Sequence, residues 1–218
     1  MANIRPYKEV SLANVENDVV VSHLTDDELQ RLTEAFRKYY DEVENIPKYA
    51  RRAAKRGRYW IIFLFLRYTG ARLSEVLNID EGRDIDIRNS EVRLITLKRQ
   101  GKRKKGKVFR IIPISPYVIN EYLRFVSLHP ELKGKIFKLN RSNFYKVFYK
   151  LARDAGIPDN LAHPHILRHT RAVELVRAGI PITVVQQLLG HATLNTTAIY
   201  LRYSSMEVKA IMKDRGLI

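Results

Sequence analysis

The sequence contains no cysteine and no long apolar run. The absence of cysteine excludes disulfide bonds, thiolate nucleophiles and cysteine-ligated zinc sites together. The six histidines show no HExxH-like spacing, so we expect no metal site. No segment reaches the roughly 18 consecutive apolar residues that a membrane-spanning helix needs, and the N-terminus lacks a signal-peptide pattern. We therefore expect a cytoplasmic protein without a membrane anchor.

Acidic residues are scarce relative to basic ones. The 218 residues include 39 Lys and Arg against 23 Asp and Glu, a formal net charge of +16. Such a charge attracts polyanions, and nucleic acid is the commonest partner of a basic globular protein. A thermophile-like charged surface or a ribosome-associated protein would have a similar composition. Because 45% of the residues are hydrophobic, the chain can bury a core, and general disorder is not expected.

Capping residues and apolar spacing predict a mostly helical chain. Thr25 and Glu28 match a capping box, and we expect a helix from there to about Asp41. The apolar run Trp60–Leu66 predicts a second helix, which should stop at Gly70. Further helices are expected after Ser115, from Ser142 to about Ala155, from Pro164 to near Gly179, from Pro181 to Gly190, around Tyr200, and from about Ser205 to Arg215. Residues expected to face inward include Leu29, Leu32, Phe36, Tyr39, Val118, Ile119, Tyr122, Phe125, Val184, Val185, Leu188 and Leu189.

Two strands are predicted around a glycine-containing turn. Glu91–Leu97 and Val108–Ile114 are rich in apolar and β-branched residues, and glycines 101 and 106 lie between them. Residues 1–24 carry no clear period, and we interpret them as an N-terminal arm with one short strand at Val19–Val21. The predicted fold is therefore mainly α with a small antiparallel β-sheet, an α+β domain over residues 25–218.

Two stretches concentrate the positive charge. Residues 48–58 contain six Lys or Arg and no acid, and residues 98–110 contain eight. We expect the second stretch, at the tip of the predicted hairpin, to contact phosphates, although solvated charge that only aids solubility would have the same pattern. The residues expected to bind DNA are Arg51, Arg52, Lys55, Arg56, Arg99, Lys102, Arg103, Lys104 and Lys105.

An arginine also begins the predicted helix after Gly70. Arg72 is expected in its first turn, where a cation is unfavourable against the helix dipole, and this indicates a bound anion. The alternative is an exposed ion pair between Arg72 and Glu75, one turn later, worth a few tenths of a kcal/mol.

The stretch His163–Tyr200 gathers groups that suit phosphoryl transfer. His165 and Arg168 are three residues apart and share a helix face. His191 belongs to the only Gly-His pair in the chain, and Tyr200 comes nine residues later. An imidazole moves protons near neutral pH, a guanidinium binds phosphate with two hydrogen bonds, and a phenol can act as a covalent nucleophile. Together these groups predict phosphoryl transfer through a tyrosine.

Three segments of the chain resemble the signature motifs of the tyrosine recombinase (phage integrase) family. They are YTGARLSEVLNI, HILRHT and LLGHATLNTTAIY, and they occur in the family's order. The resemblance covers the chain from about Thr25 to its C-terminus. It implies the catalytic-domain fold of that family and double-stranded DNA as the partner.

The resemblance also implies a role for each matching residue. Tyr200 would attack the scissile phosphate, giving a 3′-phosphotyrosyl link and a free 5′-hydroxyl, without metal or ATP. Lys98 at the hairpin would protonate the leaving oxygen, although Lys102, Lys104, Lys105 and Lys107 crowd the same turn. Tyr203 is the alternative nucleophile, which the spacing from His191 disfavours. The remaining implied roles are phosphate binding by Arg72, Arg168 and His191, proton acceptance by His165, and orientation of the site by Glu75. His163 and His169 flank the motif, and we interpret them as structural or capping residues.

The chain departs from the family in one respect. Members usually carry an N-terminal helical domain that closes around DNA, but here only 24 residues precede the capping box. The chain is therefore either a catalytic fragment or a short form. DNA affinity should then depend on the two basic stretches, with strong salt dependence and weak sequence specificity.

Other functions remain open from the sequence. A type IB topoisomerase-like enzyme would share the chemistry without exchanging strands. A non-catalytic DNA-binding protein could use the helices at 164–178 and 181–189 as a helix-turn-helix, but it would not need the full polar set. The apolar face of the final helix, with Val208, Ile211 and Met212, could pack on its own domain or on a second copy in a homo-oligomer.

Overall fold

The computed structural model describes residues 22–96, 108–190, 212–213 and 216. Within these residues the elements are α1 (Asp26–Glu44), η2 (Pro47–Tyr49), α2 (Ala50–Thr69), α3 (Leu73–Val76), α4 (Glu81–Asp84), β1 (Ile85–Asp86), β2 (Glu91–Thr96), β3 (Val108–Pro113), α5 (Pro116–Leu128), η3 (Pro130–Leu132), α6 (Arg141–Asp154), α7 (Ile166–Arg177) and α8 (Ile182–Leu189). The mainly helical fold with a small antiparallel sheet is confirmed. None of the described helices is long and apolar enough to cross a membrane.

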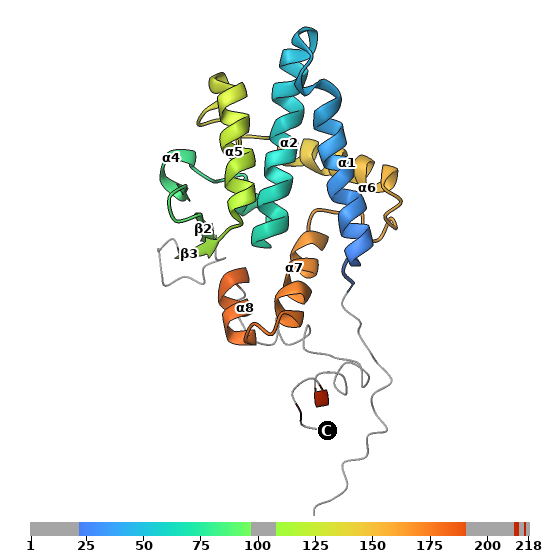
Figure 1. Cartoon of the computed structure of the whole chain (residues 1–218), viewed down its shortest axis with the longest axis vertical. Helices are drawn as coiled ribbons and strands as arrows, with labels where there is room; N and C mark the ends of the chain where they lie inside the picture. Colours follow the sequence, from blue (N-terminus) through green and yellow to red (C-terminus); the bar gives the residue numbers. More distant parts are fainter. Residues whose placement is uncertain (1–21, 97–107, 191–211, 214–215, 217–218) are drawn as a thin grey trace, which may run out of the picture.

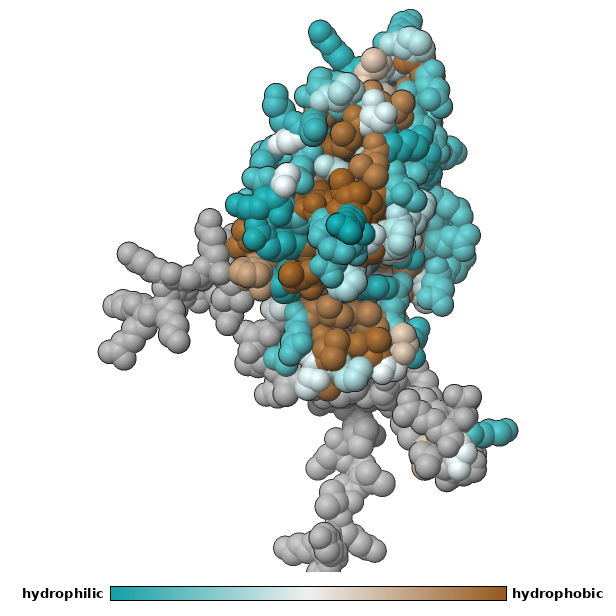
Figure 2. Space-filling view, turned by 60° about the vertical axis from the view of Figure 1, so that its left-hand side comes forward, coloured by the Kyte–Doolittle hydropathy of each residue, from teal (hydrophilic) through white to brown (hydrophobic). Residues whose placement is uncertain are grey.

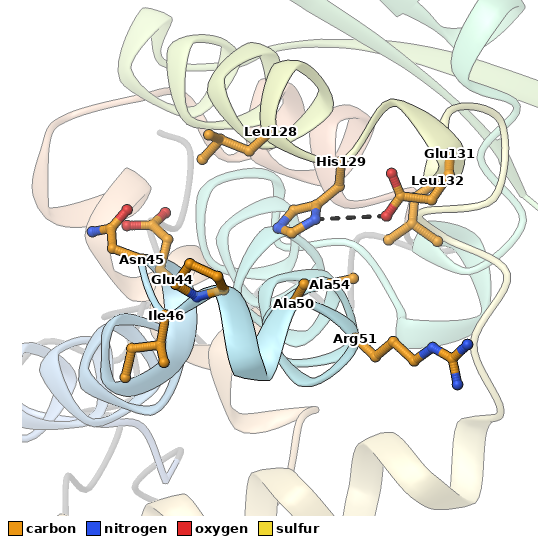
Figure 3. A pocket seen from close by; sticks show the side chains of 11 residues that line it. Glu44, Asn45, Ile46, Ala50, Arg51, Ala54, Leu128, His129, Glu131 and Leu132 are labelled. Carbon is orange, nitrogen blue, oxygen red and sulfur yellow. Dashed lines mark ion pairs between the residues drawn. The ribbon is translucent and has the colours of Figure 1, made fainter.

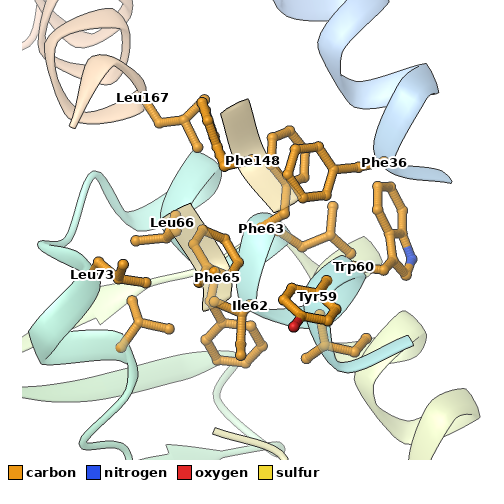
Figure 4. Close-up of a cluster of buried hydrophobic side chains, with 14 of the residues drawn as sticks. Phe36, Tyr59, Trp60, Ile62, Phe63, Phe65, Leu66, Leu73, Phe148 and Leu167 are labelled. Carbon is orange, nitrogen blue, oxygen red and sulfur yellow. The ribbon is translucent and has the colours of Figure 1, made fainter. Parts of the chain in front are cut away.

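Helix α2 is the centre of the domain. It contacts α1, α5 and α7, and α7 and α8 lie beyond its C-terminal end (Figure 1). Every residue from Tyr59 to Leu66 is buried, so apolar side chains cover the whole circumference of this part of the helix. Leu73 of α3 and Leu167 of α7 lie in the same cluster of side chains (Figure 4). Leu73 directly follows Arg72 and Leu167 directly precedes Arg168 in the sequence, so the core anchors the backbone beside both arginines.

Helix α1 begins as predicted and extends further than expected. The Glu28 N–H donates to Thr25 Oγ1 at 3.2 Å, and the Thr25 N–H donates back to Glu28 Oε2 at 2.8 Å. The helix continues past Asp41, and Tyr40 is buried in place of the predicted Tyr39. Tyr39 instead packs under the Arg56 guanidinium, which lies 4.1 Å from its ring centroid. The apolar stripe keeps its helical spacing, and the prediction was wrong by one position at its end.

Two later helices also differ in detail. Asn140, not Ser142, caps α6, because its side chain accepts the Asn143 N–H at 3.2 Å. In α8 only Val185 and Leu189 are buried, so the predicted burial of Val184 and Leu188 was wrong. Val184 is 39% exposed and Leu188 is partly buried. This helix of eight residues packs against α7 through a narrow apolar stripe, in which one side chain from each turn is buried.

The sheet has the order β1-β2-β3 and is antiparallel throughout. Strand β1, only two residues long, was not predicted because it is too short to show alternation. Val92, Leu94 and Ile112 face the core, whereas Phe109 and Ile111 are more than half exposed. One face of the sheet therefore packs on the core, and the other is exposed. Hydrophobic patches lie among hydrophilic ones on the side of the molecule shown in Figure 2.

Three predicted elements fall wholly or partly outside the described residues. These are the strand at Val19–Val21, the short helix around Tyr200, and the final helix, of which Met212 and Lys213 are described as helical. Leu24 lies within the described part and is 2% exposed, and its N–H donates to Thr170 Oγ1 at 3.0 Å. The chain therefore joins the core one residue before the capping box.

Candidate active site

Helix α2 ends in a turn that leads directly to Arg72. Gly70 adopts a left-handed conformation with φ of 62°, and its N–H donates to the Leu66 carbonyl at 3.0 Å. The Ala71 N–H donates to Thr69 Oγ1 at 3.1 Å, and this turn is buried. A glycine accepts such a φ without steric cost. The predicted helix stop is confirmed, and the turn fixes where Arg72 leaves the core.

The two predicted phosphate-binding arginines meet at this turn. Arg168 Nη1 donates to the Gly70 carbonyl at 2.9 Å, a contact between residues 98 positions apart. Arg168 is 1% exposed, whereas the side chain of Arg72 is 41% exposed. A buried guanidinium is held by its neighbours and an exposed one can reach a ligand, so the pair combines a buried cation with an accessible one.

Glu75 is buried beside Arg72. Its Oε2 accepts the Arg72 N–H at 2.8 Å, and its Oε1 lies 3.4 Å from Arg72 Nη1. The Glu75 side chain is only 3% exposed, so the alternative of an exposed surface pair is wrong. Arg72 is the N-cap residue of α3 and not a member of its first turn. Burial alone would raise the pKa of Glu75, but the hydrogen bonds and charges of Arg110 and Arg72 lower it.

His165 stands next to Arg168 at the start of α7. It is the N-cap residue, one position before the helix in which it was expected. Its ring and that of His169 are perpendicular, with centroids 4.7 Å apart. Partial burial, followed by the charges of His169, Arg168, His163 and Arg72, lowers the pKa of His165 to about 4. The imidazole is therefore neutral at pH 7 and can accept a proton.

The predicted catalytic residues Lys98, His191 and Tyr200 lie outside the described part of the chain, but the elements that precede the first two are described. Strand β2 ends at Thr96, two residues before Lys98. Helix α8 ends at Leu189, and Gly190, in a left-handed conformation, directly precedes His191. The predicted residues outside the described part are Lys98, Arg99, Lys102, Arg103, Lys104, Lys105, His191 and Tyr200.

The basic stretch at 48–58 lies towards the opposite end of α2. Arg51, Arg52 and Lys55 are exposed there. Arg56 is partly buried, and its Nη1 donates to Glu42 Oε2 at 2.8 Å. With a rise of 1.5 Å per residue, Lys55 is roughly 21 Å along the helix from Thr69, the last residue of α2. The exposed cations of this stretch therefore lie far from the Gly70 turn.

A groove of about 720 Å³ lies at that same end (Figure 3). It is formed where α1, α2 and α5 end or begin, and its lining includes Glu44, Arg51 and Leu128. His129 points into it, with Nδ1 3.6 Å from Glu131 Oε1. The groove contains none of the predicted catalytic residues, so we place the candidate active site at the Gly70 turn.

Arg110 was counted only as part of the basic hairpin, and its position in the structure is different. Its side chain is 10% exposed and faces inward from β3. Strand alternation offered the signal, because Arg110 and Ile112 are two residues apart and share a face, opposite Phe109 and Ile111. The partners of Arg110 could not be predicted, since Glu75 is 35 positions away.

Replacing Gly70 with alanine should destabilise the domain at the site itself. A Cβ there would lie 2.7 Å from Leu189 Cδ2 and 3.2 Å from Arg171 Cγ, in addition to the unfavourable φ. We expect a loss of about 2–4 kcal/mol in the free energy of unfolding, measured with urea. Gly179→Ala is the matched control, because Gly179 has φ of 77° and no atom within 4 Å of the added Cβ. An equal loss of free energy of unfolding in both variants would show that the contacts of the added Cβ with Leu189 and Arg171 are not the cause.

Comparison with known proteins agrees with this geometry. Residues 23–207 match the model of the phage integrase family. The chain belongs to the phage integrase family. The resemblance predicted from the three motifs is therefore confirmed. A tyrosine recombinase of Pseudothermotoga lettingae is 33% identical over 158 residues, which are 70% of this chain and 52% of that protein. Tyrosine recombinase XerA of Pyrococcus furiosus is 32% identical over 205 residues, 89% of this chain and 62% of that protein.

Solved structures of the family share the fold. XerA recombinase aligns with a TM-score of 0.67 and 25% identity over 89% of this chain and 65% of that one. The catalytic domain of bacteriophage HP1 integrase aligns with a TM-score of 0.57 and 21% identity over 88% of this chain and 94% of that domain. The chain spans about half to three-fifths of the length of the two curated relatives above. It thus has the fold of a family catalytic domain.

Proposed function

We propose that this chain is a site-specific recombinase or integrase that cleaves and rejoins DNA through a covalent 3′-phosphotyrosyl intermediate at Tyr200. The observation that carries the proposal is the meeting of Arg72 and Arg168 at the Gly70 turn, beside a neutral His165. Two guanidiniums and a proton acceptor are what phosphoryl transfer without a metal requires. Residues 25–218 would form the catalytic domain, acting on double-stranded DNA in the cytoplasm. The final helix would link copies on DNA.

The chemical steps conserve the energy of the phosphodiester. The Tyr200 oxygen forms a bond to phosphorus, its proton passes to His165, and the bond from phosphorus to the 5′-oxygen breaks. Lys98 gives a proton to that leaving oxygen. Arg72, Arg168 and His191 stabilise the charge on the non-bridging oxygens. Rejoining reverses each step with a 5′-hydroxyl as the attacking group.

Bound DNA should change the proton affinity of His165. Nearby cations contribute to the low pKa of this imidazole, and a phosphate between Arg72 and Arg168 offsets them. An added negative charge favours the protonated form and raises the pKa. His165 would therefore become a better base when the substrate is in place.

The pH dependence of cleavage should show this change. The rate falls as pH falls through the pKa of His165, because a protonated imidazole cannot accept the Tyr200 proton. At limiting DNA the acid limb reports the free enzyme, so it should lie near the pKa of about 4. At saturating DNA the limb reports the complex and should lie at a higher pH. Limbs at the same pH under both conditions, or a limb unchanged in His165→Gln, would contradict this.

Covalent trapping tests the proposed function itself. Duplexes with a nick and a randomised sequence, labelled at the 5′ end of the strand to be cut, are incubated with the protein and separated under denaturing conditions. We expect labelled DNA to migrate with the protein, and peptide mapping to place it on Tyr200. Sequencing the trapped DNA would then reveal the target. Salt-sensitive DNA binding without any covalent product would show a non-catalytic DNA-binding protein, and would overturn the proposal.

Two further substrates separate recombination from topoisomerase-like activity. Relaxation of supercoiled plasmid by a monomer would favour the type IB topoisomerase-like reaction. Joining of strands from two differently labelled sites would favour recombination.

A further inference from the structure

Arg110 connects three elements that meet at the candidate active site. From β3, its Nη1 and Nη2 donate to the two oxygens of Glu75 at 3.0 and 2.8 Å. Its Nε donates to the Leu188 carbonyl, in the last turn of α8, at 2.7 Å. A bidentate guanidinium–carboxylate pair fixes direction as well as distance. The end of α8 is therefore tied to the start of α3 through one side chain.

The guanidinium of Arg110 also lies directly against Gly190. A Cβ on Gly190 would be 2.9 Å from Arg110 Nη1 and 3.1 Å from its Cζ. Gly190 has φ of 69° and closes α8 directly against the Arg110 side chain. His191 is the next residue in the sequence. Arg110 thus contacts the last described residues of α8, immediately before His191 in the sequence.

The geometry around Glu75 shows a second effect of Arg110. Glu75 faces two arginines, but only Arg110 makes short contacts with both of its oxygens. Arg72 Nη1 remains at 3.4 Å from Oε1, and its side chain stays 41% exposed. A buried carboxylate without Arg110 would attract the nearest remaining cation, which is Arg72. Its guanidinium would then turn inward and away from a ligand.

We propose that Arg110 is a positioning residue: by occupying both oxygens of Glu75 and holding the end of α8, it keeps Arg72 available for the scissile phosphate. The inference rests on the proposed function and extends it to a residue outside the family motifs quoted above. Arg110 acts through Arg72 and the α8 end and does not itself touch the substrate.

The test compares Arg110→Met with the double variant Arg110→Met/Glu75→Gln. Cleavage is measured in a single turnover at saturating nicked DNA, and affinity is measured separately. We expect Arg110→Met to slow cleavage by about 100-fold, the effect of a small misplacement of a catalytic group, with a change in affinity below about threefold. Glutamine at position 75 has no charge to attract Arg72 but can still accept the Arg72 N–H. The double variant should recover at least about tenfold of the lost rate.

Arg93→Met is the matched control. Arg93, on the neighbouring strand β2, also pairs with a buried carboxylate, with Nη2 2.9 Å from Asp84 Oδ1. We expect its cleavage rate to stay within about threefold of the wild type. Urea unfolding of each variant shows that the rates are measured on folded protein. A double variant as slow as folded Arg110→Met, or an effect confined to DNA affinity, would overturn the proposal.

A readout without catalysis separates this inference from the proposed function. Hydrogen exchange of the Arg72 Nε–H is followed by NMR, with the signal assigned by its loss in Arg72→Lys. We expect slower exchange in Arg110→Met, because Arg72 closes on Glu75, and wild-type exchange in the double variant. If the wild type forms no covalent adduct, the proposed function fails, and this exchange still decides the position of Arg72. Unchanged exchange in Arg110→Met would overturn the inference.

Discussion

The Tyr200→Phe variant is expected to form no covalent adduct with DNA. The substitution removes one oxygen, the atom that bonds to phosphorus in the proposed reaction, and leaves the aromatic ring. Loss of a nucleophile costs at least about 10⁴-fold in rate, because the remaining groups have no bond-forming partner to assist. DNA affinity should change little, since one neutral hydroxyl contributes about 1 kcal/mol. Denaturing electrophoresis and equilibrium binding on the same nicked duplex measure the two effects.

Tyr203→Phe is the natural control for this prediction. It removes the same atom three residues further along the chain and should leave adduct formation intact. The reverse result, with adduct from Tyr200→Phe and none from Tyr203→Phe, would show that the spacing from His191 was misread. If both variants lose adduct formation, one of the two tyrosines has a structural role, and peptide mapping then identifies the nucleophile.

Arg168→Lys is expected to reduce cleavage by about 10³-fold or more at saturating DNA, the scale measured for arginines that stabilise phosphoryl transfer. Arg168 is 1% exposed, and one of its nitrogens already donates to the Gly70 carbonyl at 2.9 Å. A guanidinium can make this bond and still present further donors, whereas an ammonium is a point charge that cannot span both positions. Single-turnover kinetics measure the loss, and urea unfolding measures the accompanying destabilisation.

Arg171→Lys provides the comparison on the same helix. Arg171 packs its Cβ and Cγ against Gly70, and its Nη1 lies 2.9 Å from Glu174 Oε2. Lysine keeps those methylene groups, so we expect less than a threefold change in rate, as for an ordinary partly exposed ion pair worth about 0.5 kcal/mol. Similar losses in both variants would mean that packing against the turn, and not the guanidinium of Arg168, determines the rate.

Local features of the fold were predictable from short stretches of sequence. The capping box at Thr25, the helix stop at Gly70 and the cap at Ser115 are all as expected. Each depends on hydrogen bonds or backbone angles within three or four residues, so the sequence contains the whole interaction. The two longer strands were found for the same reason, through their composition and the turn between them.

The errors share a different cause. Tyr39 was expected inside and Tyr40 is, because the edge of the helix stripe depends on which neighbour packs there. Arg110 was assigned to a basic tip and faces inward to Glu75. In each case the pattern showed the residue type, and contacts with distant segments determined its environment.

The sequence alone determined the chemistry of the candidate site: which arginines, histidines and tyrosine are present, in what order, and with what helical spacing. That was enough to predict the family. Only the tertiary structure decided how the charges are used, with Arg168 buried against Gly70 and Glu75 shared between Arg72 and Arg110. The physical reason is that the burial and pairing of a charge depend on residues far along the chain. No local pattern contains those residues.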